Sequence, residues 1–296
     1  MPKQKLDFGN IYNEAVEWLC LYNNRLDTYW QWCSHDCSYC YAKALLQFRW
    51  LWHPNNPKPA NVKEIYKIVA TQCDSKIPTR LWWMTDCFQP IERIHKVTYH
   101  TLKAFNKMRK PYLLLTKSDL IATDEYIEVL DKDLAHIQIT VTTSSDEICA
   151  RYEKATRPSD RIKAIEKLQR LWYDVQIRLS PFIPWLADPK EFNKIKCDKI
   201  LIEFLRVNHR IKKWFGEFIN DKDYPITYQG YQHMTFERKK ELVKDFTIKE
   251  ITVCDFDRNH LDYWKKEYNP NPNDCCNLRW IYPNPKKDAK TEVWLQ

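Results

Sequence analysis

Short apolar runs alternate with longer amphipathic stretches along most of this 296-residue chain, and this alternation narrows the available folds more than any other feature. The runs have the length of strands, while the stretches between them repeat apolar residues every three or four positions, as helices do. Repeated strand–helix units favour a largely parallel sheet covered by helices. We therefore predict an α/β protein built as a partial (β/α)6 barrel of the TIM type.

The predicted elements also divide the chain. We place strands near Thr28–Trp32, Arg80–Thr85, Tyr112–Thr116, Ile137–Thr142, Val175–Ser180, Lys199–Phe204 and Glu250–Cys254. We place helices at Tyr41–Trp50, Val62–Thr71, Arg93–Met108, Asp160–Trp172 and Asp188–Ile195. The expected organisation is an N-terminal segment, residues 1–26, a barrel core, residues 27–206, and a helical C-terminal extension, residues 207–296, that is a candidate substrate lid.

Composition excludes several classes of protein. Hydrophobic residues make up 44% of the chain and aromatic residues 14%, which is enough for a core and argues against disorder. Only three glycines occur, so Gly-rich phosphate loops are absent. The N-terminus lacks the apolar core of a signal peptide, and no membrane span is present, so we expect a cytoplasmic protein. A net charge of +8 is compatible with a polyanionic partner without identifying one.

Three cysteines crowd into eight residues in the spacing CxxxCxxC, directly after the first predicted strand: Cys33, Cys37 and Cys40. The total of eleven cysteines is odd and the chain is too large to need disulfides, so a metal site in a reducing compartment fits better. Thiolates suit iron–sulfur clusters, and three of them leave one iron of a 4Fe–4S cluster without a protein ligand. The alternative is a structural zinc site whose fourth ligand is His35 or a distant cysteine.

This spacing, with the aromatic Tyr39 before the third cysteine, resembles the signature of the radical S-adenosylmethionine (SAM) superfamily. Residues 29–204 resemble the branch that contains spore photoproduct lyase and DNA-repair-photolyase-like proteins. The resemblance implies a barrel of the radical SAM kind and a 4Fe–4S cluster on Cys33, Cys37 and Cys40. It also implies that SAM binds the open iron and that a flavodoxin- or ferredoxin-type donor supplies electrons.

The resemblance further implies which side chains bind SAM. Tyr39 would contact the adenine, Thr85 and Asp86 the ammonium group, and Lys117 the carboxylate. The other candidates lie at or near later strand ends, or in the loop before the fourth helix: Thr140, Thr142, Glu153, Arg161, Arg178 and Ser180. Two alternatives stay open, namely that Asp86 only caps a helix and that Lys117 is a solvated lysine. The chain departs from the family where Lys154 and Ala155 replace a Pro-Gly pair.

A hydrogen-atom donor is harder to place. In spore photoproduct lyase a cysteine that returns hydrogen to the product lies just before the Thr-Asp stretch, where this chain has Met84. Cys87 is one candidate for the donor, unless it is only a small buried hydrophobe. Cys275 and Cys276 are further candidates, or one of them joins Cys254 in a second metal site.

The predicted activity is that of a radical SAM enzyme of the lyase or isomerase type. Its substrate would be a nucleotide or nucleic acid, DNA or RNA, in DNA repair or base modification. A basic segment interleaved with aromatic residues suits phosphates and bases, although a charged helix face has the same pattern: Arg206, His209, Arg210, Lys212, Lys213, Trp214 and Phe215. The alternatives are a radical SAM enzyme for an amino-acid or peptide derivative and a non-catalytic zinc-binding nucleic-acid module.

Overall fold

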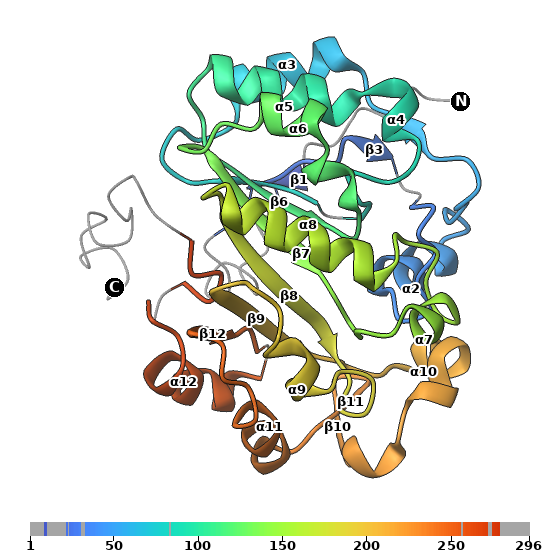
Figure 1. The fold of residues 1–296 in the computed structure, drawn as a ribbon. Helices are drawn as coiled ribbons and strands as arrows, with labels where there is room; N and C mark the ends of the chain where they lie inside the picture. The colour runs from blue at the N-terminus through green and yellow to red at the C-terminus, as the bar shows by residue number, and fades with distance from the viewer. Residues whose placement is uncertain are drawn as a thin grey trace, which may run out of the picture.

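The computed structural model describes residues 9–10, 22, 24–30, 33–82, 84–255, 257–271 and 274–278. Its main sheet has eight strands in the order β1-β2-β5-β6-β7-β8-β9-β12 (Figure 1). They are β1 Gly9–Asn10, β2 Asn24–Arg25, β5 Thr79–Leu81, β6 Tyr112–Thr116, β7 Ala135–Thr140, β8 Asp174–Phe182, β9 Lys199–Phe204 and β12 Glu250–Val253. Neighbouring strands from β2 to β12 are parallel, and β1 is antiparallel to β2.

The seven parallel strands follow the same order in the sheet as in the chain. Each connection therefore moves toward the same edge, and right-handed connections of this kind place the helices on one face. A sheet wound in one direction is the architecture of a TIM-type barrel. In the described chain β2 does not pair with β12, so the barrel is open. The α/β partial-barrel prediction is confirmed for six strands, and β12 adds a seventh from the region expected to be an extension.

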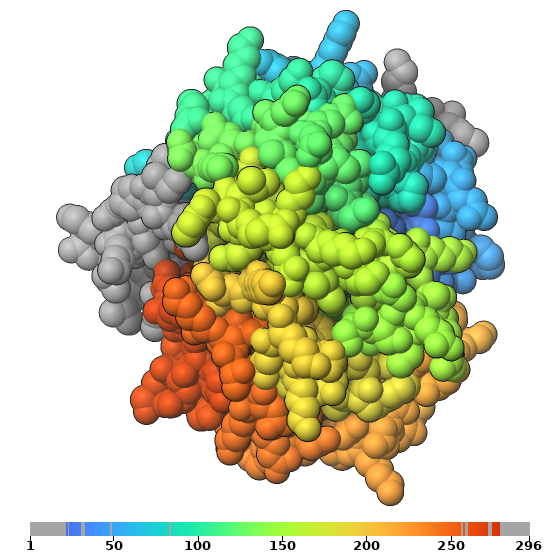
Figure 2. Space-filling view, viewed as in Figure 1, coloured from blue at the N-terminus to red at the C-terminus, as the bar shows by residue number. Residues whose placement is uncertain are grey.

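Helices cover the outer face of the sheet (Figure 1). The described helices are α2 Tyr41–Phe48, α3 Val62–Thr71, α4 Glu92–His95, α5 Val97–Lys107, α6 Asp124–Val129, α7 Asp146–Ala150, α8 Pro158–Arg170, α9 Pro189–Phe192, α10 His209–Phe215, α11 Phe236–Val243 and α12 Arg258–Glu267, and of these α2 and α10 lie at one end of the strands rather than on this face. Phe105 of α5 and Leu168 of α8 are fully buried in the same core as Ile137 and Ile139 of β7. Figure 2 shows the side chains of this helical layer hiding the strands behind them.

Helix starts follow from local sequence. Asn61 caps α3 by accepting the backbone N–H of Lys63 at 2.9 Å. Asn208 caps α10 in the same way, accepting the N–H groups of Arg210 and Ile211. Asn, Asp, Ser and Thr satisfy the unpaired donors of a first helical turn, so such residues mark where helices begin.

The first predicted strand, Thr28–Trp32, was expected to begin the barrel, and this prediction is wrong. Its described part forms β3, Tyr29–Trp30, which pairs with β4, Lys58–Pro59, in a separate small sheet. The first parallel strand of the main sheet is instead β2, which is short and polar and so carries no apolar signal. Aromatic residues favour strands wherever these lie, so the pattern located a strand but not its sheet.

Other boundaries shift for identifiable reasons. The single helix predicted at Arg93–Met108 is two helices, because Lys96 has a φ of 51° and separates α4 from α5. The helix predicted at Asp188–Ile195 is only the four-residue α9. A hairpin of β10, Ile226–Tyr228, and β11, Tyr231–His233, accompanies the helices of the extension. Most of segment 1–26 and residues 279–296 lie outside the described residues. None of the described helices is long and apolar enough to cross a membrane.

The inner face of the sheet is polar. Side chains alternate along each strand, so β7 sends Ile137 and Ile139 outward and Gln138 inward. Gln138 Nε2 donates to Gln176 Oε1 of β8 at 2.9 Å. Near the amino ends of the strands, the Asp174 carboxylate contacts both His136 Nδ1 and Lys199 Nζ at 2.6 Å. These buried polar groups satisfy one another, which leaves the opposite, carboxyl end of the barrel for ligands.

Candidate active site

The three cysteines lie in a loop that leads into α2. Cys37 is buried, and Cys33 and Cys40 are half-buried. Cys40 is the N-cap of α2, and its Sγ accepts the Lys43 backbone N–H at 3.4 Å. Asp36 has a φ of 42°, a left-handed conformation that aspartate tolerates better than most residues, and Lys43 Nζ donates to it at 2.7 Å. Interactions among neighbouring residues therefore determine the conformation of the loop, which ends at Cys40.

The chemistry of the loop fits an iron–sulfur cluster. Burial raises the pKa of all three thiols, and bound iron reverses this preference because metal-ligating thiols are deprotonated. Zinc–sulfur bonds of about 2.3 Å would bring the sulfurs to about 3.8 Å from one another. The three Sγ atoms do not all lie within 4.8 Å of one another, since in the described chain only Asp255, Asp257 and His260 form such a group. A cluster takes each thiolate on a different iron and therefore does not require the three sulfurs to surround one metal ion.

A buried ion pair adjoins the loop. The Glu153 carboxylate pairs with Arg161 and accepts the Tyr39 hydroxyl, and neither member of the ion pair has exposed side-chain surface. Cys37 Sγ lies 3.6 Å from Glu153 Oε2. Burial alone would raise the pKa of Glu153, but Arg161 and Lys117 lower it to about 2. Glu153 is therefore a carboxylate at neutral pH, placed directly behind the cysteine loop.

Arg161 ties this carboxylate to the barrel. Its guanidinium donates to the carbonyl oxygens of Thr140 at 2.8 Å and Thr156 at 2.6 Å. A backbone hydrogen bond from the Ser38 N–H to the Tyr152 carbonyl oxygen, at 2.8 Å, completes the junction between the cysteine loop and the loop before α8. The Glu153–Arg161 pair thus holds two loops at the end of β7.

Asp86 connects the cysteine loop with β6. Its Oδ1 accepts Thr116 Oγ1 and the Phe88 N–H, both at 2.8 Å, and its Oδ2 accepts the Lys117 N–H at 2.7 Å. His35 Nε2 lies 3.2 Å from Oδ2, although without hydrogen-bond geometry. Burial alone would raise the pKa of Asp86, but these contacts lower it. Asp86 is therefore an anchor with both oxygens occupied, and a contact with the SAM ammonium stays a prediction.

Two residues near Asp86, Thr85 and Lys117, differ in whether their side chains have hydrogen-bond partners. Thr85 is buried and its hydroxyl donates to the Tyr29 carbonyl oxygen at 2.7 Å. Lys117 is half-buried, and its Nζ lies 5.6 Å from the centre of the Tyr39 ring. Within the described residues its ammonium group has no hydrogen bond or ion pair. Burial by itself lowers the pKa of Lys117, but the charges of Cys37, Glu153 and Asp86 raise it overall. A charged ammonium group therefore stands beside the cysteine loop.

A second polar group lies at the carboxyl ends of β8 and β9. Arg178 donates to Gln138 Oε1 at 2.8 Å and pairs with Glu203, which also accepts the Ser180 hydroxyl at 2.8 Å. Burial alone would raise the pKa of Glu203, whereas Arg178 in particular lowers it. Sequence reasoning did not single out Gln138, because its importance depends on facing Arg178 across the sheet. Thr140 shares this inner face.

The remaining predicted residues are Thr142, Cys87, Cys275 and Cys276. Thr142 follows β7, and its hydroxyl bonds the Tyr152 hydroxyl at 2.9 Å. Cys87 is buried in the outer core, with its thiol 4.0 Å from the Leu115 carbonyl oxygen. Cys275 and Cys276 lie on the opposite, inner side of the sheet, where Cys276 packs with Leu115.

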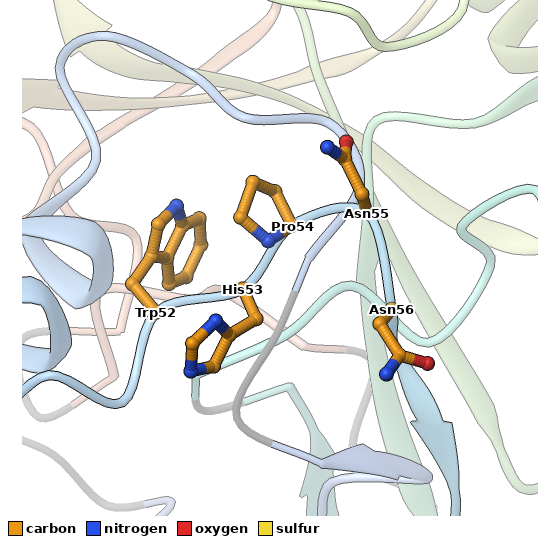
Figure 3. A pocket seen from close by; sticks show the side chains of 5 residues that line it. All are labelled: Trp52, His53, Pro54, Asn55 and Asn56. Atoms are coloured by element: carbon orange, nitrogen blue, oxygen red, sulfur yellow. The ribbon is translucent and has the colours of Figure 1, made fainter.

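One cavity, of about 420 Å³, lies away from all of these residues. It belongs to the loop after α2 and is lined by Trp52, His53, Pro54, Asn55 and Asn56 (Figure 3). None of the predicted site residues contributes to it, so it does not alter the assignment of the site.

The fold is an open barrel of parallel strands, and the loop that carries Cys33, Cys37 and Cys40 lies at the carboxyl ends of these strands. Figure 1 shows β7 and β8 ending toward the corner where α2, α7 and α10 meet. The chain belongs to the radical SAM superfamily, whose family model matches residues 28–180, just over half of its length. Membership of this family implies SAM and an iron–sulfur cluster, and it favours the cluster over the zinc alternative.

Solved structures with the same fold include spore photoproduct lyase. Its complex with dinucleoside spore photoproduct aligns with a TM-score of 0.56 and 13% identity, over 88% of this chain and 78% of that chain. A variant of the lyase with bound AdoMet and dinucleoside spore photoproduct aligns with a TM-score of 0.55 and 12% identity, over the same shares. At this identity the likeness extends to the fold alone. No curated protein sequence matches this chain.

Proposed function

We propose that this protein cleaves SAM reductively and uses the resulting 5′-deoxyadenosyl radical to abstract hydrogen from a nucleotide or nucleic-acid substrate. Cys33, Cys37 and Cys40 would hold a 4Fe–4S cluster, which when bound supplies the electron for SAM cleavage. A flavodoxin- or ferredoxin-type donor would reduce it in a reducing, cytoplasmic compartment. The reaction would be of the lyase or isomerase type, in DNA repair or base modification.

The main support for SAM binding beside the cysteine loop is the ammonium group of Lys117. It is charged, stands next to Cys37 and Glu153, and has no ion-pair partner among the described residues. SAM must present a carboxylate to bind beside such a cluster, and a lone cation in a partly buried site favours a carboxylate over a neutral group. Tyr39, whose ring lies beneath this ammonium group, would then border the adenine.

The nucleic-acid part rests on the charge at the barrel mouth. The guanidinium groups of Arg178 and Arg206 both lower the pKa of the Glu203 carboxylate there. Guanidinium groups at this end of the barrel suit the phosphates of a nucleotide. The exposed aromatic ring of Tyr228, in the β10–β11 hairpin, offers a surface on which a base could stack. We also propose that residues 207–296 form a lid over the substrate.

The test measures 5′-deoxyadenosine formed by the reconstituted, anaerobic protein with SAM and dithionite. We expect formation to be faster with ultraviolet-irradiated DNA than with the same DNA unirradiated, and to stop in Cys33→Ala. Formation that is indifferent to DNA would favour an amino-acid or peptide derivative as substrate. A protein that binds zinc and no iron would contradict the whole proposal.

A further inference from the structure

An exposed tryptophan lies on a stack of aromatic rings at the carboxyl end of β8. Trp185 belongs to the loop after this strand, and 50% of its surface is exposed. Its indole ring stacks on Phe218, with the ring centres 5.7 Å apart and an angle of 16° between the ring planes. Its Nε1 donates to the Phe218 carbonyl oxygen at 3.0 Å. The indole is therefore held in one orientation, with its N–H satisfied and the side away from Phe218 turned to solvent.

The stack continues inward to the cysteine loop. Phe218 ends the short 3-10 helix η2, Gly216–Phe218, and stacks on Phe215 of α10 with ring centres 4.9 Å apart. Phe215 in turn contacts the edge of Tyr39, with ring centres 5.5 Å apart. Both phenylalanines are buried. Trp185 is thus attached to the same packed unit as the cysteine loop, and little conformational entropy is lost when a ligand covers it.

Positive charge lies next to this stack on α10. Residues 206–218 contain four basic side chains and one acidic side chain, Glu217. Lys212 pairs with Asp221 at 2.8 Å, whereas Lys213 is exposed and has no ion pair in the part of the chain that the structure describes. The basic segment singled out in the sequence is therefore an exposed helix face beside the aromatic stack.

A further cation lies against the stack itself. Arg151 directly follows α7, and its guanidinium group lies 4.9 Å from the centre of the Phe218 ring. It pairs with Glu217 at 2.6 Å, and both side chains are 56% exposed. Figure 1 shows α7 and α10 at the same corner of the molecule. An exposed ion pair of this kind is weak, so a phosphate can compete with Glu217 for the guanidinium group.

An exposed aromatic ring beside cations is the combination that binds unpaired nucleic acid, because rings stack on bases while cations contact phosphates. The bases of a duplex are already stacked on their neighbours, so a base has to be unpaired or extruded before it can lie on an indole. The other end of β8 offers a comparison. Trp172 precedes this strand and is 78% exposed, but it lies at the amino ends of the strands, away from the cysteine loop.

We propose that the outer face of Trp185 is a stacking platform for an unpaired base of a polynucleotide, whose phosphates contact the cations of α10; this inference rests on the proposed function. The nucleic acid is bound through a single-stranded or locally unpaired segment beside the barrel mouth. DNA and RNA present the same base faces and phosphates, so binding measurements with each distinguish the two.

Equilibrium binding tests the platform. Fluorescence anisotropy of the cluster-loaded protein, without reductant, gives the Kd for a labelled oligothymidylate, for an oligouridylate of the same length and for a DNA duplex. We expect at least one single strand to bind more tightly than the duplex. Trp185→Ala should raise the Kd of that strand by about 5- to 150-fold, the range for loss of one stacked base, and Trp172→Ala should leave it unchanged. The tighter strand identifies DNA or RNA as the ligand.

Two further variants separate stacking from a general disturbance of the fold. Trp185→Phe keeps an aromatic ring and should raise the Kd less than Trp185→Ala. Lys213→Gln should reduce the slope of log Kd against log salt by about 0.7, the value for one phosphate contact on a single strand. Equal affinity of the wild type for the single strands and the duplex, or an unchanged Kd in Trp185→Ala, would overturn the inference. So would a wild type that binds none of the three.

Photochemical cross-linking requires no variant. The protein is irradiated in complex with a single strand that contains 5-iodouracil, which couples to aromatic side chains in contact with it, and the adduct is mapped by mass spectrometry. We expect the adduct on Trp185, and adducts confined to other residues would refute the platform. Neither measurement involves SAM cleavage. Faster 5′-deoxyadenosine formation with DNA, together with an unchanged Kd in Trp185→Ala, would therefore remove this inference alone. Binding that depends on Trp185 without any 5′-deoxyadenosine formation would remove the proposed function alone.

Discussion

Cys37 Sγ lies 3.6 Å from Oε2 of Glu153, so the middle cysteine of the loop touches a carboxylate from 116 positions further along the chain. A carboxylate beside a metal-binding thiol is tolerable because Arg161 and Lys117 place positive charge around it. The contact makes the geometry of the cysteine loop depend on the loop before α8. A substitution in either loop should therefore change the conformation of the other.

Loss of one partner from the buried Glu153–Arg161 pair should destabilise the fold. Glu153→Ala leaves an unpaired guanidinium in the core, and we expect a loss of about 3–5 kcal/mol in the free energy of unfolding. Urea denaturation measures it. Replacing both residues, as Glu153→Leu with Arg161→Met, should recover much of the loss. The exposed pair of Lys167 and Asp124 is the control, because Lys167→Ala should cost about 0–1 kcal/mol. Equal losses of unfolding free energy in Glu153→Ala and Lys167→Ala would show that burial does not make the Glu153–Arg161 pair special.

Lys117→Met should weaken SAM binding without removing the cluster. A charge-assisted hydrogen bond contributes about 1.5–3 kcal/mol, which corresponds to a rise of about 10- to 100-fold in the SAM Kd. Equilibrium binding to the cluster-loaded protein measures the Kd, and iron content is determined alongside. Lys163→Met, at an exposed lysine on α8, should leave both quantities unchanged. Unaltered SAM affinity in Lys117→Met would remove Lys117 from the site.

Acid should weaken the fold partly through Asp174. Burial alone would raise the pKa of Asp174, but His136 and Lys199 lower it well below the usual value. A carboxyl whose pKa is lower in the folded state stabilises the fold above its unfolded pKa of about 4, and this contribution is lost as the pH falls. Asp174→Asn should be less stable at pH 7 and lose less stability on acidification. Urea unfolding measured from pH 7 downward tests this, and parallel pH curves for variant and wild type would refute it.

Lys239 occupies the centre of an acidic group beyond β12. Its Nζ lies 2.9 Å from the Asp255 carboxylate, 2.5 Å from Asp257 and 3.3 Å from His260 Nδ1. Lys239→Ala should cost about 3–5 kcal/mol, because two carboxylates are left facing each other.

The ligand atoms of Asp255, Asp257 and His260 lie within 4.8 Å of one another, so Zn²⁺ or Mn²⁺ should restore part of the Tm in Lys239→Ala. The same ions should have no such effect on the wild type or on Lys240→Ala. A variant whose Tm does not respond to either ion would contradict this account.

The fold was predictable where the signal is local. Strands such as β6 and β9 are short apolar runs, and their bounds agree with the prediction. The failures have local causes as well: β2 has only two polar residues, and Lys96 breaks a helix without proline or glycine to mark the break. The order of the strands followed from the repeated strand–helix units, because right-handed connections allow few arrangements.

The sequence by itself determined the cysteine loop, because three ligands within eight residues need no information about distant parts of the chain. It also indicated the side chains at strand ends, since strand ends follow from periodicity. Only the tertiary structure decided what these side chains contact: both oxygens of Asp86 accept hydrogen bonds, Lys117 has no ion-pair partner in the described chain, and Arg178 pairs with Glu203. The reason is physical, because periodicity reports the face a residue occupies, whereas contacts between distant segments depend on how the strands pack.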